Sequence, residues 1–188
     1  IAPPEHFVSE SVREKIFIGE LPDAPYLAES FDIVMLWHVL EHLPDPRAYL
    51  AKVRHLLKKE SRVVIEVPNW ASWQARLTEA HWFNLDVPRH VFHFTPHSLT
   101  QLLDESGFRI ENIAHYSPLY SVYGWVQSIL NIVTRRKNIL FDVLNGKISL
   151  RNYATHGVRV WELVSTIVFL APACALSLVL TILEALVR

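Results

Sequence analysis

The chain has 188 residues, with 18 lysines and arginines against 19 acids, and a net charge of −1 at neutral pH. This length suffices for one domain with a sizeable core, and the balanced charge argues against a nucleic-acid partner. The single cysteine, Cys174, excludes a disulfide framework and a cysteine-based zinc site, so we expect a reducing compartment. The sequence begins with Ile1 and shows no signal-peptide pattern, so we expect a fragment of a longer protein.

The first half of the chain alternates short apolar runs with one helical pattern. Lys15–Ile18 and the continuous apolar run Phe31–Trp37 predict strands, the second buried on both faces. Asp45-Pro46 then supplies a helix N-cap and a first-turn proline, and we expect the helix to end near Lys58-Lys59. Arg62–Val67 predicts another buried strand.

The same alternation continues further along the chain. Residues 70–77 predict a short helix, and Thr95-Pro96 opens a longer one that we expect to stop at Gly107. Phe108–Tyr116 predicts a further strand. Strands separated by helices of this length indicate βαβ units, hence an α/β fold with a mostly parallel sheet.

The composition changes after this α/β part. Tyr120–Val133 predicts an apolar helix, and residues 134–160 carry six lysines and arginines against one acid, Asp142. From Leu163 to Val187 the only charged residue is Glu184. Because about 20 apolar residues suffice to cross a bilayer, we favour membrane association of this run over a buried core helix.

Pro172 interrupts the apolar run near its middle. A proline there can divide the run into two helices too short to span, so we expect a hairpin or interfacial anchor rather than a single crossing. The upstream cations favour the cytoplasmic side, which predicts a protein on the inner face of the membrane.

Polar residues follow the predicted strand Phe31–Trp37. His38, Glu41 and His42 stand in a His-x-x-Glu-His segment just before the capped helix. In open α/β sheets, ligands bind outside the carboxyl ends of the strands, so these side chains lie where chemistry is expected.

This segment, Phe31–Pro46, resembles the fourth strand and following loop of class I S-adenosylmethionine-dependent methyltransferases, above all a bacterial group with the pattern FD-V---HVLEH--DP. A second block, His81–Pro96, with its Asp86–His90 sequence DVPRH, resembles the same group's substrate-side loop. The resemblance covers roughly residues 8–133 and implies a partial Rossmann-like sheet, S-adenosylmethionine as methyl donor, and transfer to a small or lipid-linked acceptor, with oxygen the favoured atom.

The resemblance also assigns candidate site residues. Methyl transfer needs positioning and removal of one proton, and the candidate bases are His38, Glu41, His42 and His90. The candidate donor-binding residues are Glu20, Leu21, Trp37 and His38. We infer no protein partner and assign no metal ligand.

The family binds its donor with a glycine-rich turn and a following acid. This sequence holds five glycines and no such cluster, so we expect weak donor binding by this chain alone. The resulting organisation is a partial methyltransferase domain over residues 1–118, a basic helical extension over 119–160, and an apolar membrane-associated helix or hairpin over 161–188.

Two alternatives remain open at this point. The chain is either part of an active methyltransferase or a catalytically inactive, membrane-anchored module. The His38–His42 segment also matches the H-x-x-E-H pattern of inverted zinc peptidases, which needs these residues on a helix. Pro44 argues against such a helix, so we favour this peptidase interpretation least.

Overall fold

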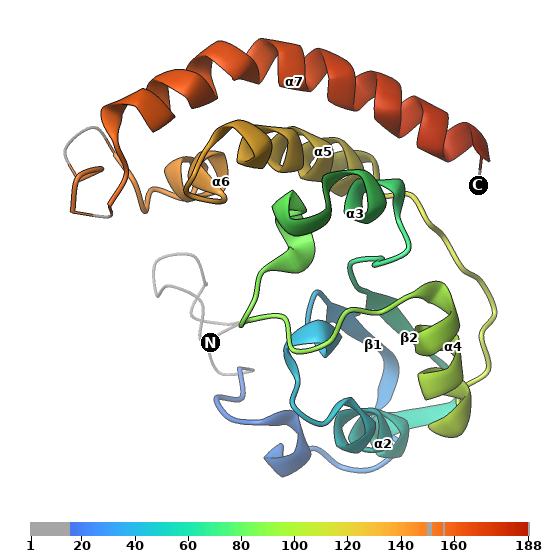
Figure 1. The fold of residues 1–188 in the computed structure, drawn as a ribbon. Helices are drawn as coiled ribbons and strands as arrows, with labels where there is room; N and C mark the ends of the chain where they lie inside the picture. Colours follow the sequence, from blue (N-terminus) through green and yellow to red (C-terminus); the bar gives the residue numbers. More distant parts are fainter. Residues whose placement is uncertain (1–15, 150–151, 156, 188) are drawn as a thin grey trace.

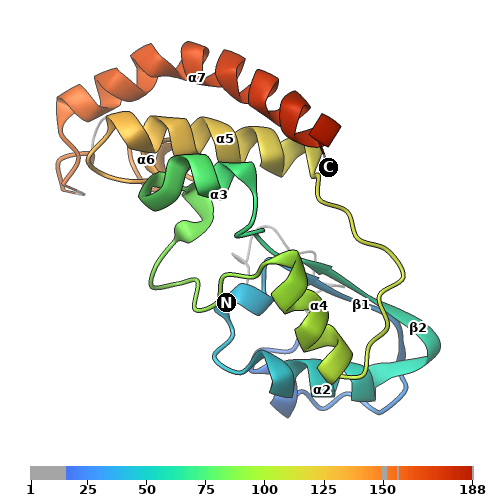
Figure 2. The ribbon, with the colours of Figure 1, turned by 45° about the vertical axis from the view of Figure 1, so that its right-hand side comes forward.

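The structure is a computed structural model that describes residues 16–149, 152–155 and 157–187. It has two layers, a small α/β unit and a layer of helices formed by α3 and the C-terminal part of the chain (Figures 1 and 2). In chain order, with η for 3-10 helices, the elements are η2 (Leu21–Asp23), β1 (Phe31–Trp37), η3 (Leu40–His42), α2 (Pro46–Leu56), β2 (Leu57–Glu66), α3 (Trp73–Thr78), η4 (Glu79–His81), η5 (Phe83–Leu85), α4 (Pro96–Glu105), α5 (Pro118–Val133), α6 (Ile139–Leu144) and α7 (Val160–Val187).

β1 and β2 pair in parallel and α2 connects them, which is the βαβ arrangement predicted from the sequence. The register pairs Ile33 with Arg62 and continues without a shift to Trp37 opposite Glu66. Both strands therefore end at the same edge of the sheet, and the predicted α/β class is confirmed.

α2 ends earlier than predicted, at Leu56 rather than near Lys58-Lys59. The chain turns directly into β2, and Leu57 already pairs with the start of β1. The Lys58 amine then contacts the Asp32 carboxylate of β1 at 2.8 Å. Lys58 therefore forms an ion pair between the two strands and does not lie in the last turn of α2.

Two predicted strands are not found in the part of the chain that the structure describes. Ile16–Ile18 is irregular, and Lys15 lies outside the described residues. Residues 108–116 are also irregular, and the sheet of the described residues consists of β1 and β2 alone. Phe108 and Ile110 instead pack against the core, and Arg62 pairs with Glu111 at 2.8 Å.

The core of the α/β unit lies between the sheet, α2 and α4. Its buried members are Leu36, Leu40, Leu43, Tyr49, Leu50, Val53, Leu57, Phe94, Leu102 and Leu103. Fully burying one such side chain stabilises the fold by about 1.5–3 kcal/mol. Leu40 and Leu43 flank Glu41 and His42, so the core itself holds the segment after β1 in place.

In the helical layer, α5 and α7 lie side by side and run in opposite directions (Figures 1 and 2). Val126 and Leu130 of α5 form a buried cluster with Ala173 of α7. α3 and α6 contact α5 as well, so α5 joins the apolar C-terminal helix to the rest of the molecule.

α7 is one continuous helix of 28 residues with Pro172 inside it, so the predicted break into a hairpin is wrong. The neighbouring residue Ala173 is 2 % exposed and packs against α5. This contact lies next to the proline, so α7 packs on α5 at the point where a break was predicted. Figure 1 shows α7 as an arch over α5. Proline costs helix stability, but packing of this kind offsets the cost.

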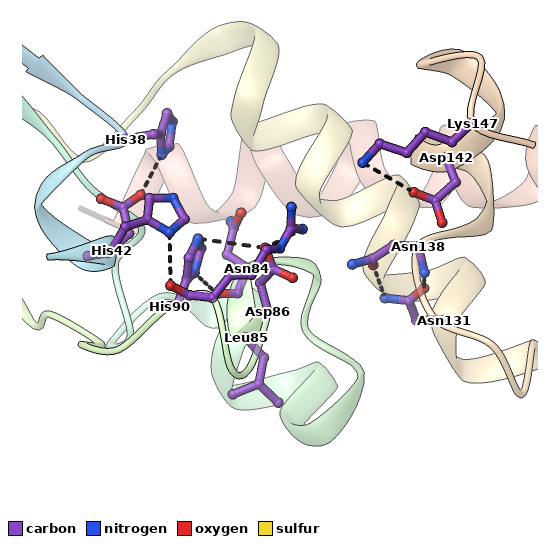
Figure 3. A network of polar contacts seen from close by, with 12 residues as sticks. His38, His42, Asn84, Leu85, Asp86, His90, Asn131, Asn138, Asp142 and Lys147 are labelled. Carbon is purple, nitrogen blue, oxygen red and sulfur yellow. Dashed lines mark hydrogen bonds and ion pairs between the residues drawn. The ribbon is translucent and has the colours of Figure 1, made fainter. Parts of the chain in front are cut away.

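The helical layer buries many polar side chains beside its apolar clusters, whereas α7 exposes apolar side chains on its outer face. The buried polar residues of α5 and α7, with the adjoining Thr134, are Gln127, Ser128, Asn131, Thr134, Glu162, Thr166, Ser177 and Thr181. Asn131 donates to the Asn138 side chain at 2.9 Å and accepts from Gln127 at 3.0 Å, so these groups are hydrogen-bonded (Figure 3). The exposed apolar face of α7 departs from the usual soluble pattern of a polar surface.

Candidate active site

The site begins where β1 ends. His38 follows Trp37 with a φ of +49°, a left-handed conformation that is uncommon for a residue other than glycine. Its backbone N–H still donates to the Glu66 carbonyl at 2.9 Å, which continues the strand pairing. The backbone then leaves the sheet, and the imidazole stays at the carboxyl edge between the two strand ends.

Two carboxylates contact the His38 ring. Nδ1 lies 3.2 Å from Oε1 of Glu41, and Nε2 lies 3.4 Å from Oε1 of Glu66, a contact without hydrogen-bond geometry. The hydrogen bond to Glu41 raises the pKa of His38, burial opposes the rise, and the charges of Glu41 and Glu66 add to it. Glu66 was not predicted as a site residue, although its place at the end of a predicted strand marks the same edge.

The second block of the sequence, here residues 81–94, contains the short helix η5, is otherwise largely irregular, and is stabilised by its own polar contacts. Arg89 pairs with Asp86 at 2.6 Å, and Nδ1 of His90 lies 2.7 Å from the Asn84 carbonyl. Nε2 of His93 lies 2.9 Å from the Leu85 carbonyl. These contacts fix the direction of the His90 ring (Figure 3).

This loop docks on η3 through backbone hydrogen bonds. The N–H groups of Val91 and Phe92 both donate to the Glu41 carbonyl, at 2.8 and 3.1 Å. Nδ1 of His42 lies 2.9 Å from the Arg89 carbonyl, and the rings of His42 and His90 are 4.6 Å apart. The four predicted bases, His38, Glu41, His42 and His90, are therefore brought together from two segments far apart in sequence. Figure 3 shows three of them, His38, His42 and His90.

His90 differs electrostatically from His38. Burial lowers the pKa of His90, and the hydrogen bond to Asn84 and the charge of Glu41 only partly oppose this. His90 is therefore neutral at physiological pH, whereas His38 holds its proton more readily.

An aromatic surface lies beside these groups. Trp37 remains 47 % exposed, and the Tyr120 ring from the first turn of α5 lies 6.2 Å from it and 5.0 Å from His38. Nothing in the local sequence marks Tyr120 as a site residue, because only the packing of α5 over the α/β unit brings it there.

The remaining candidates, Glu20 and Leu21, lie in a different setting. Glu20 is exposed, and Leu21 packs against the core of the α/β unit in a short helix that contacts α2. Their role in binding the donor stays a prediction.

The zinc-peptidase interpretation fails on geometry. Val39 lies between the left-handed His38 and a three-residue 3-10 helix, so the His-x-x-Glu-His pattern does not form the required α-helix. The His38 ring is also turned onto Glu41, the residue that would act as the base.

Comparison with known proteins identifies the α/β part of the chain. A family model described as a methyltransferase domain matches residues 5–113. Among solved structures, one match is a SAM-dependent methyltransferase, a possible histamine N-methyltransferase, from Thermotoga maritima. It is 22 % identical with a TM-score of 0.43, and the match covers 49 % of this chain and 44 % of that one. A search of curated proteins found no match.

Proposed function

Because the chain belongs to the methyltransferase-domain family, we propose that the full-length protein transfers a methyl group from S-adenosylmethionine to an acceptor oxygen. The acceptor in this proposal is small or lipid-linked. The observation that carries the proposal is the His38 imidazole, oriented by buried Glu41 at the carboxyl end of β1. Ligands of parallel α/β sheets bind at this edge.

The described residues include groups that could bind the sulfonium end of the methyl donor. S-adenosylmethionine carries a positive sulfonium, and the edge presents the exposed Trp37 ring together with the partly exposed carboxylate of Glu66. Aromatic faces and carboxylates both attract a cation. The glycine-rich turn for the other end is not in this sequence, so we still expect weak donor binding by this chain alone.

The bound donor supplies an already activated methyl group, so the protein must position the acceptor and accept one proton from its hydroxyl. We assign proton acceptance to Nε2 of His38. Glu41 holds Nδ1 of the same ring, and a carboxylate in this place fixes the tautomer that leaves Nε2 as the base. Tyr120, at 5.0 Å from this ring, closes one side of the site.

Substitution tests this assignment in the full-length protein. With methyl-labelled S-adenosylmethionine and a membrane extract as acceptor source, we expect His38→Ala to lower turnover by about 10²–10⁴-fold, the usual contribution of a general base. Glu41→Gln should lower it less, because the ring remains but loses its charged partner. Exposed His97 on α4 offers the control His97→Ala, which should leave turnover unchanged.

Two outcomes would contradict the proposal in different ways. Unchanged turnover in a folded His38→Ala protein would remove His38 from the chemistry. No methyl transfer by the full-length protein to any extract component would favour the inactive, membrane-anchored module instead.

We also propose that α7 associates with the cytoplasmic surface of a membrane. It is long and apolar enough to cross one, a property that some core helices of soluble proteins share. What favours the membrane is the distribution of its side chains: Thr166, Ser177 and Thr181 are buried, whereas Ile167 and Leu178 are 72 and 55 % exposed. An exposed apolar face of this extent marks a membrane or protein contact.

The one charged residue of the apolar run also turns inward. Oε1 of Glu184 accepts the backbone N–H of Trp73 in α3 at 2.9 Å. The other acid of α7, Glu162, is buried, so neither acid lies on the exposed face of the helix. A helix crossing the membrane would lose this hydrogen bond and its packing on α5. We therefore propose that α7 lies along the membrane surface, which would present lipid-linked acceptors to the enzyme.

A further inference from the structure

We propose that Glu41, His42 and His90 form a binding site for one divalent transition-metal ion of the zinc type. One carboxylate oxygen of Glu41 and one ring nitrogen of each histidine lie within 4.8 Å of one another. One ion with ligand distances of about 2.0–2.2 Å holds its ligand atoms at most about 4.4 Å apart, so shifts of a few tenths of an ångström bring these side chains onto a single ion. The sequence shows only a His-x-x-Glu-His pattern here, and this pattern does not mark the third ligand, His90, which comes from a distant loop.

The state of Glu41 is the second observation. Its side chain is 1 % exposed, Oε1 contacts His38, and Oε2 has no hydrogen-bond partner among the described residues. A buried carboxylate oxygen without a partner is costly, and such atoms in native structures call for an unseen ligand or ion. A cation between Glu41 and the two histidines would satisfy this oxygen.

Both histidines are already oriented as metal ligands usually are. Nδ1 of His42 contacts the Arg89 carbonyl at 2.9 Å, and Nδ1 of His90 contacts the Asn84 carbonyl at 2.7 Å. A carbonyl partner places the ring proton on Nδ1 and leaves the lone pair of Nε2 for a metal. These carbonyls therefore act as the outer contacts that hold ligand rings in metal sites.

The nearest competing group is Asp86, whose Oδ2 lies 3.9 Å from Nε2 of His90. This distance is too long for a hydrogen bond, and the same oxygen pairs with Arg89 at 2.6 Å. The His90 lone pair thus remains available, and Asp86 adds negative charge near the ion.

The ligand set selects the class of metal. Two imidazole nitrogens and one carboxylate suit Zn²⁺, Co²⁺ or Fe²⁺, whereas Mg²⁺ and Ca²⁺ prefer oxygen ligands throughout. Three protein ligands leave coordination positions open, and an acceptor oxygen would bind there if the proposed function holds. The binding proposal itself does not depend on methyl transfer.

Metal titration without donor or acceptor tests the site directly. We expect the 188-residue chain to bind one Co²⁺, seen in its visible absorption spectrum, and one Zn²⁺ that displaces it, with no binding of Mg²⁺ at the same concentration. Glu41→Gln, His42→Ala and His90→Ala should each weaken Co²⁺ binding at least about tenfold, because each removes one ligand. His97→Ala should bind like the unaltered chain.

Circular dichroism and thermal unfolding show that each variant is folded. If His90→Ala unfolds, Glu41→Gln and the exposed His42→Ala decide the question. No Co²⁺ binding by the unaltered chain would overturn the proposal, as would equal binding by folded Glu41→Gln and His42→Ala. Loss of binding in these variants with methyl transfer absent throughout would support the metal site and refute the proposed function.

Discussion

Glu162 is the acid that joins the start of α7 to the end of the α5 segment. It is 2 % exposed, and its carboxylate accepts the backbone N–H groups of Arg136 and Arg159, both at 3.0 Å. Burial opposes the charged form, but the hydrogen bonds from Arg159 and Arg136 outweigh it and lower the pKa of Glu162 below its ordinary value of 4.5.

Because the folded state lowers this pKa, the charged carboxylate stabilises the fold above pH 4.5, and the contribution is lost as the pH falls toward the lower folded pKa. We expect Glu162→Gln to cost about 1.5–3 kcal/mol at pH 7, the range for hydrogen bonds to charged groups. The cost should shrink in acid. Denaturant unfolding at pH 7 and below pH 4 measures both, and exposed Asp104→Asn is the control. An equal cost at both pH values would contradict the argument.

At the residue scale, the local pattern locates the residues of the candidate site, and their catalytic roles stay predictions. His38, Glu41 and His42 follow a buried strand, so the strand pattern alone placed them at a ligand-binding edge, and the structure brings His90 to them. Glu66 and Tyr120 were missed for different reasons. Glu66 is the last residue of a predicted strand, and nothing in the local sequence distinguishes it from other strand ends. Tyr120 lies beside His38 only because α5 packs there.

At the scale of elements, α4 shows how directly local sequence sets a boundary. The Thr95 side chain accepts the Ser98 N–H at 3.1 Å, and the Ser98 side chain accepts the Thr95 N–H at 2.9 Å, which is a capping box. Pro96 then occupies the first helical position. These contacts explain why the predicted start of this helix is confirmed.

Removing the cap should destabilise the protein measurably. We expect Thr95→Ala to lower the free energy of unfolding by about 1 kcal/mol, since the N–H of Ser98 loses its partner. Exposed Thr100 in the same helix gives the matched control, because Thr100→Ala deletes the same atoms away from the cap and improves helix propensity. Equal losses in the two variants, measured by urea denaturation, would show that the cap is unimportant.

The incorrect element predictions share one cause. A segment such as Phe108–Tyr116 becomes a strand only when it pairs with a sheet edge, and no local pattern reports whether that pairing forms. Pro172 was expected to break α7 for its missing N–H, but the packing of Ala173 on α5 decides otherwise. Tertiary contacts override local preference in both places.

At the scale of the whole molecule, the two layers differ in what they bury and expose. The α/β unit buries leucines and valines around α2, as soluble domains do. The α5–α7 pair buries amides, hydroxyls and Glu162 beside its apolar contacts, and α7 exposes apolar side chains. Hydropathy detects the apolar composition of α7 but not which face is exposed, so the membrane-facing side could be proposed only from the structure.

This arrangement predicts which side chains contact lipid. Ile167 and Leu178 are exposed on α7, and eleven positions is close to three helical turns, so both lie on one face. We expect Ile167→Glu/Leu178→Glu to lower flotation with vesicles of phosphatidylcholine and phosphatidylglycerol at least about tenfold, because charged groups are costly in hydrocarbon. Leu27 is 79 % exposed on the α/β unit, so Leu27→Glu should float like the unaltered chain.

Carbonate extraction of cell membranes then separates a surface helix from a spanning one. A helix held on α5 by Ala173, with Glu184 bound to the Trp73 N–H, should leave the membrane at alkaline pH together with its domain. Retention in the membrane would show that α7 crosses, and would mean that its packing on α5 is given up there. Unchanged flotation of the double variant would show that the exposed face of α7 does not contact lipid, and a protein partner would then be the better explanation for that face.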